Sequence, residues 1–178
     1  MLKRIFRAIL LFFLCQSFTT DDTVPDVKEL RKEVIVAIEK SSVTDSLYKT
    51  LKPVNPKPPI IVGYVAMLEA LKAKHAWNPY SKFSYLGKSR KTFEEAVSAD
   101  PENLEIRFMR FSVQHFLPSY LGYSKNLEED RKQIIRLLEK QNKNDRAYTK
   151  TVVRFLLDSK RCTTSEEAFL HKELKNLV

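Results

Sequence analysis

The sequence contains very little glycine and histidine. Gly63, Gly87 and Gly122 are the only glycines among 178 residues, and they lie too far apart to form the phosphate-binding loop of a Walker or Rossmann site. The three histidines are 40 or more residues apart, and neither a His-Glu-x-x-His nor a Cys-x-x-Cys pattern occurs, so a zinc site is not indicated. A Gly-x-Ser-x-Gly hydrolase motif is also missing. We therefore expect a protein that has no catalytic activity and binds neither a cofactor nor a metal.

Cysteine is nearly absent as well, and one of the two cysteines lies in a segment with the features of a secretory signal peptide. Basic residues precede an apolar run over residues 8–14, which is shorter than the roughly 20 residues that cross a bilayer. Small residues at Cys15 and Ser17 fit a cleavage site, which predicts a signal peptide over residues 1–17 and export to the periplasm or the medium. The alternative is a lipid anchor on Cys15, which the bulky Phe13 and Leu14 disfavour.

Cleavage changes the charge and the cysteine count. Removing three basic residues from the 31 Lys and Arg leaves 28 against 22 Asp and Glu, a net charge of +6. Cys162 then has no partner for an intramolecular disulfide, so a packed core must stabilise the fold. We expect Cys162 to be a small buried hydrophobic residue; the alternative is a reactive or intermolecularly bridged thiol.

The chain beyond the signal peptide reads as helix throughout, which predicts an all-α protein of about eight helices in stacked antiparallel hairpins. A helical pair is expected over residues 18–52, with Thr23 as its first cap and Pro25 in the first turn. Four prolines make residues 53–59 a stiff connector to a helical-hairpin domain over residues 60–178.

Further helix boundaries follow from capping patterns. Asp100 with Pro101 predicts the start of a fifth helix, which should be central because most of its circumference is apolar. The spacing of Asn126 with Glu129, and of Thr164 with Glu167, predicts the starts of two later helices.

One short stretch resembles a tetratricopeptide repeat. Phe93, Ala96 and Pro101 have the spacing of that repeat's second helix and closing turn, whereas Asn78 and Pro79 interrupt the helix that precedes them. The resemblance implies a degenerate repeat in a right-handed array of helix pairs, with a concave surface that binds a protein or peptide. A broader resemblance is to small exported bacterial proteins, which adds a compartment and no chemistry.

The most informative charge pattern lies between residues 72 and 91. This segment has six basic residues and no acidic one, interleaved with aromatic residues. Basic and aromatic side chains together suit an acidic protein or peptide segment, with anionic lipid or an envelope polyanion as alternatives and nucleic acid disfavoured by export. The structural alternative is that Trp77, Phe83 and Tyr85 belong to the core and the lysines form a solvated face. The candidate binding residues are Lys72, Lys74, Trp77, Tyr80, Lys82, Lys88, Arg90 and Lys91.

A second cluster supports a runner-up function. Arg107 and Arg110 lie on the apolar fifth helix and need partners, for which Glu94, Glu95 or Glu105 are candidates. Buried ion pairs between helices are one interpretation. The other is a pocket for a small anionic ligand or an envelope lipid, formed by Arg107, Arg110, His115 and Tyr123. We expect a non-catalytic interaction or scaffolding module first, and this ligand-binding protein second.

Overall fold

The computed structural model describes residues 25–55, 57–140 and 145–177. The predicted signal peptide, Cys15 and Thr23 lie outside the described residues. Within them the protein is all-α, with eight α-helices and one short 3-10 helix, as the sequence predicts. The helices are α2 (Val27–Glu39), α3 (Ser41–Leu51), α4 (Pro59–His75), α5 (Pro79–Ala99), α6 (Leu104–Phe116), α7 (Leu127–Lys140), α8 (Arg146–Ser159) and α9 (Thr164–Asn176), and the 3-10 helix is η1 (Ser119–Leu121).

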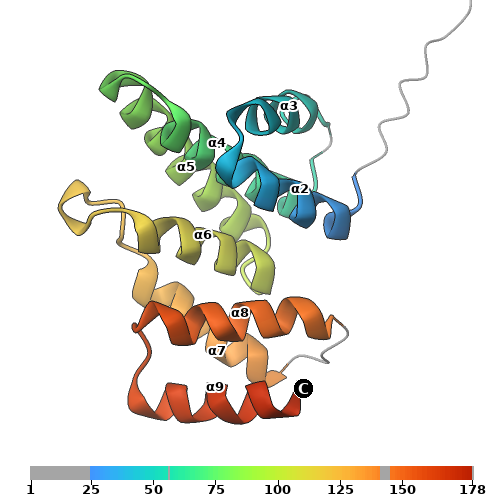
Figure 1. Ribbon diagram of the computed structural model, residues 1–178, viewed down its shortest axis with the longest axis vertical. Coiled ribbons are helices and arrows are strands. Elements are labelled where there is room, and N and C mark those ends of the chain that lie inside the picture. The colour runs from blue at the N-terminus through green and yellow to red at the C-terminus, as the bar shows by residue number, and fades with distance from the viewer. Residues whose placement is uncertain (1–24, 56, 141–144, 178) are drawn as a thin grey trace, which may run out of the picture.

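The helices form a stack in which neighbours along the chain also touch in space (Figure 1). The hairpin of α4 and α5 lies at one end with α3, α6 crosses the middle, and α7, α8 and α9 form the other end. The contacts join α2 with α3, α4 with α5, α6 with α7, and α8 with α9. Because the two helices of each such pair turn back on one another, they cover each other's apolar faces.

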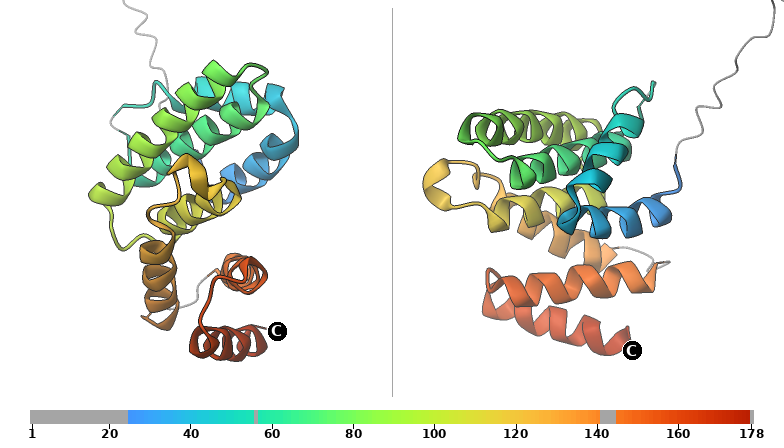
Figure 2. Two further views of the ribbon diagram at one scale, coloured as in Figure 1. Left: turned by 90° about the vertical axis from the view of Figure 1, so that its left-hand side faces the viewer. Right: turned by 45° about the horizontal axis from the view of Figure 1, so that its top comes forward.

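Two hydrophobic cores meet at α6, the helix that the sequence predicts to be central. Nine of its thirteen residues are buried. Ile106 and Met109 enter the core shared with α2 to α5, whereas Leu104 and Phe111 enter the core shared with α7, α8 and α9. Figure 2 shows α6 between these two groups of helices. A helix with apolar residues on opposite faces can fill this position because both faces become buried.

The first two helices pack on the rest of the molecule across the proline-rich connector. Leu30 and Val34 of α2 and Leu47 and Leu51 of α3 belong to the same core as α4. The chain leaves α3 at Leu51 and enters α4 at Pro59, whose ring suits the first turn of a helix. The connector therefore separates two segments of sequence that share one core.

Three helix starts differ from the capping predictions. Asp26, after Pro25, caps α2 with its side chain on the Lys28 amide. Asn103 caps α6 by accepting from the amides of Glu105 and Ile106, so Pro101 lies in the preceding turn. The prediction from Asp100 is wrong because Asp100 ends α5 and its carboxylate accepts from Asn103.

The third shift concerns α9, whose capping box is formed by Thr163 and Glu166, one residue before the predicted pair. The Thr163 hydroxyl accepts from the Glu166 amide, and the Glu166 carboxylate accepts from the Thr163 amide. Because two threonines and two glutamates are each adjacent in the sequence, either of two capping pairs has the correct spacing, and the packing of α9 selects the first.

Candidate functional site

The corner between α4 and α5 presents aromatic side chains to solvent. Helix α4 ends at His75, and Asn78 caps α5 by accepting from the Ser81 amide at 2.8 Å. Trp77 lies in the short turn between the two helices, where no element packs against it, and it is 95% exposed. The Asn-Pro pair that departs from the tetratricopeptide pattern therefore builds the corner that exposes the tryptophan.

Exposed aromatic side chains continue along the first turns of α5. Tyr80 is 85% exposed and Phe83 is 51% exposed. The alternative that Trp77 and Phe83 belong to the core is therefore wrong, and Tyr85 is half-buried. Large exposed aromatic residues that lie close together are typical of a surface that another molecule covers.

The six basic residues of this segment divide into two groups. Lys72 pairs with Asp45, Lys74 with Glu39, and Arg90 weakly with Glu94 at 3.9 Å.

Within the described part of the chain, Lys82, Lys88 and Lys91 form no ion pair, although the Lys88 ammonium lies 5.0 Å from the centre of the Tyr85 ring. All three unpaired lysines are exposed on α5. The spacing along α5 places Lys88 and Lys91 on the same side of the helix as Tyr80, whereas Lys82 lies on the opposite side.

The outer face of α5 also carries a glycine that no packing contact explains. Positions 80, 84, 87 and 91 follow the three- and four-residue spacing of one helix face. They hold Tyr80, Ser84, Gly87 and Lys91, and a Cβ atom added at Gly87 would meet nothing within 4 Å. The side chains at the middle of this face are therefore short, between an aromatic ring and a lysine.

Arg107 and Arg110 are buried and bind carboxylates of α7. Asp130, which is fully buried, accepts from Arg107 Nη1 at 2.9 Å and from Arg110 Nε at 2.6 Å. Glu129 also contacts both arginines. None of the three predicted partners, Glu94, Glu95 and Glu105, fills this role, because Glu105 lies on the opposite side of α6 and binds Arg31 of α2.

His115 and Tyr123 have contacts of their own. Arg161 Nε donates to His115 Nδ1 at 2.9 Å, and rings of Phe111, Phe116 and Phe155 surround the imidazole. The pKa of His115 is lowered, first by burial and then by the charge of Arg161. The Tyr123 ring lies 5.8 Å from the Arg90 guanidinium. Arg107 and Arg110 thus share the carboxylates of α7, whereas His115 binds Arg161 and Tyr123 lies beside Arg90.

Cys162 is half-buried against the core of α7, α8 and α9, which fits the role of a small hydrophobic residue. Burial raises the pKa of its thiol to about 11, so it is protonated at neutral pH. Among the residues that the structure describes, no group of three or more potential ligands could hold a metal ion. In the same residues, no helix is both long and apolar enough to cross a membrane.

Comparison with known proteins gives no relative: no protein family, curated protein or solved structure matches the chain. The function must therefore be inferred from the surface of α5 and its contacts.

Proposed function

We propose that this protein is a non-catalytic binding module and that the first turns of α5, with the corner before them, bind an acidic segment of another protein. The observation that carries the proposal is the exposure of Trp77 and Tyr80, at 95% and 85%, at the start of a helix whose Lys88 and Lys91 form no ion pair with any described residue. We call the surface formed by Trp77, Tyr80, Phe83, Lys88 and Lys91 the docking surface.

The aromatic residues would supply most of the affinity. Tryptophan and tyrosine are enriched among the few interface residues that dominate binding energy, because they bury a large area with few rotatable bonds. On this surface they are already exposed, so no internal packing must be broken before a partner covers them. The short side chains around Gly87 would let a partner's backbone approach α5 closely.

The lysines would select the sign of the partner's charge. Positive residues at an interface speed association with an acidic partner and disfavour a basic one. Lys88 and Lys91 suit this role because, within the described residues, neither side chain forms an ion pair. Screening by salt should weaken the contribution of such exposed charges.

The tetratricopeptide-like arrangement and the export of the chain are further parts of this proposal. Pairing of consecutive helices, with Phe93 and Ala96 buried in the core beside α4, is what supports a repeat-like array. Export rests on the sequence of residues 1–17 alone.

Trp77 provides the test, because it is the single tryptophan of the sequence. The probe is a peptide that alternates Glu and Leu, and the control is the same peptide with Lys in place of Glu. We expect a saturable blue shift of the Trp77 emission with the acidic peptide, weaker at high salt, and no shift with the basic peptide.

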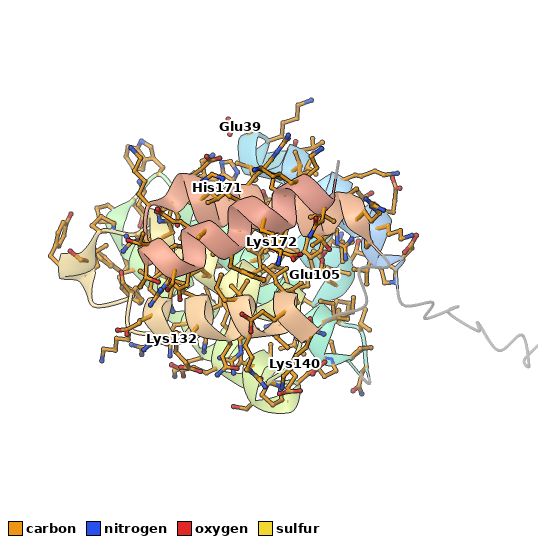
Figure 3. All side chains as sticks on the ribbon, turned by 90° about the horizontal axis from the view of Figure 1, so that it is seen from below. Glu39, Glu105, Lys132, Lys140, His171 and Lys172 are labelled. Carbon is orange, nitrogen blue, oxygen red and sulfur yellow. The ribbon has the colours of Figure 1, made fainter. Side chains whose placement is uncertain are left out.

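Two charge-matched variants show whether the docking surface is responsible. Lys88→Glu with Lys91→Glu should lower the affinity about tenfold. Lys140→Glu with Lys172→Glu makes the same change in charge on α7 and α9 and should leave the affinity unchanged. These two lysines lie at the opposite end of the stack, which Figure 3 shows from below. Equal losses in both variants, or a shift with vesicles of anionic lipid and none with the peptide, would overturn the proposal.

A further inference from the structure

A pocket of about 350 Å³ opens next to the docking surface, between α3, the end of α4 and the start of α5. Trp77 lines it and belongs to the docking surface as well, so the two are continuous. The other lining residues are mostly polar and include Asp45, Lys72, His75, Asn78 and Tyr85. A pocket of this size with polar walls fits one side chain or one terminal group of a peptide.

Lys72 is the basic residue of this pocket, and its ammonium group is held in two ways. Its side chain is only 18% exposed, and the ammonium lies 5.4 Å from the Tyr48 ring centre and 5.2 Å from the Tyr85 ring centre. Its carboxylate partner is Asp45 of α3. Burial lowers the pKa of Lys72, but the hydrogen bond and charge of Asp45 outweigh it and raise the pKa, so the ammonium stays charged.

Asp45 differs from Lys72 because its side chain is 62% exposed. An ion pair with such an exposed partner contributes little to stability, since water solvates the carboxylate once it turns away. The two tyrosine rings would still hold the ammonium in place after Asp45 left. The pair can therefore open at little cost without displacing the lysine.

We propose that Asp45 occupies the position on Lys72 that a carboxylate of the acidic partner takes when it binds. The pocket then receives one Asp or Glu side chain, or a C-terminal carboxylate, and the Asp45 side chain turns into solvent. This inference rests on the proposed function and adds to it the group that is recognised and an internal competitor. The docking surface would hold the aromatic and charged parts of the segment, and Lys72 would fix its register by binding one carboxylate.

The same fluorescence titration with the Glu and Leu peptide tests the inference. Asp45→Asn removes the competing charge and keeps the shape, and it should raise the affinity by about twofold to fivefold, the factor that corresponds to an exposed ion pair. Asp158→Asn, on an exposed position of α8, changes the net charge equally and should leave the affinity within about 1.5-fold.

Lys72→Gln should lower the affinity about fivefold, and Asp45→Asn should have no effect in that background, because the competitor then has nothing to block. Lys72→Arg keeps the charge and should bind the peptide more tightly than Lys72→Gln does. This difference separates recognition of the carboxylate from a loss of folding. Chemical unfolding of each variant checks that it folds.

The outcomes separate the two proposals. Binding that needs Lys88 and Lys91, but is equal in Asp45→Asn and Asp158→Asn, would overturn the role of Asp45 and leave the docking surface intact. An effect of Asp45→Asn that persists without Lys72 would also overturn it. Absence of peptide binding in every variant would overturn both.

Discussion

Arg31 of α2 donates two parallel hydrogen bonds to Glu105 of α6, with its Nε 2.7 Å from Oε1 and its Nη2 on Oε2. The same guanidinium binds Asp145, the cap of α8, and lies 3.8 Å from the centre of the Tyr148 ring. Tyr64 of α4 donates its hydroxyl hydrogen to Glu105 as well. One side chain from the start of the described chain therefore connects α2 with both α6 and the beginning of α8.

Removing Arg31 should destabilise the whole stack. In Arg31→Ala the largely buried Glu105 carboxylate loses its charged partner, and we expect the free energy of unfolding to fall by about 2 kcal/mol. Urea unfolding followed by circular dichroism measures this. The control is Lys32→Ala, whose fully exposed pair with Glu29 should contribute almost nothing to stability. Equal effects in the two variants would contradict the role given to Arg31.

Asp130→Asn should be more severe. The substitution leaves the guanidinium groups of Arg107 and Arg110 buried with less compensating charge, and a loss of about 3 kcal/mol is expected. Glu128→Gln, an exposed change two residues earlier on α7, should leave the stability almost unchanged. Chemical unfolding of both variants is the measurement, and an Asp130→Asn protein as stable as wild type would refute it.

Alanine at Gly87 and at Gly122 should have opposite effects, although an added Cβ clashes at neither position. Gly87 lies inside α5, where alanine favours the helix, so Gly87→Ala should stabilise the protein by about 1 kcal/mol. Gly122 has a φ of 69°, which strains an L-residue, so Gly122→Ala should destabilise it by about 1 kcal/mol. Thermal unfolding of the two variants checks the signs; a shared sign would mean that backbone conformation does not decide these sites.

Lowering the pH should weaken the contact between α6 and the segment after α8. The folded state lowers the pKa of His115, so the unfolded chain binds the proton at a higher pH than the folded protein does. Stability from this residue is therefore complete above the usual histidine pKa and is lost as the pH falls toward the lowered value.

The control for this pH effect is His115→Gln, whose amide oxygen can still accept from Arg161 and does not titrate. Urea unfolding at pH values above and below about 6.5 measures the difference. Wild type should lose more stability than the variant on acidification. A larger loss in the variant would contradict the assignment.

Much of the local structure was predictable from the sequence. Apolar spacing marks eight helices, prolines mark the breaks before α4 and α5, and the charge count between residues 72 and 91 marks the basic segment. These features depend on residues close together in the chain, so the pattern within a few turns determines them. The caps were less certain, since neighbouring polar residues offer competing registers, as Thr163 and Thr164 do.

Tertiary structure alone decided which charges are paired and which aromatic residues are exposed. Lys72 and Lys82 both belong to the basic segment, yet α3 brings Asp45 to Lys72, whereas Lys82 forms no ion pair within the described residues. Arg31 binds Glu105, 74 positions along the chain. Such contacts depend on how the helices pack across the stack. The apolar spacing within each helix does not distinguish one packing from another, so it does not predict these contacts. The sequence by itself therefore determined the helices and their charge, while packing determined the surface that remains available to a partner.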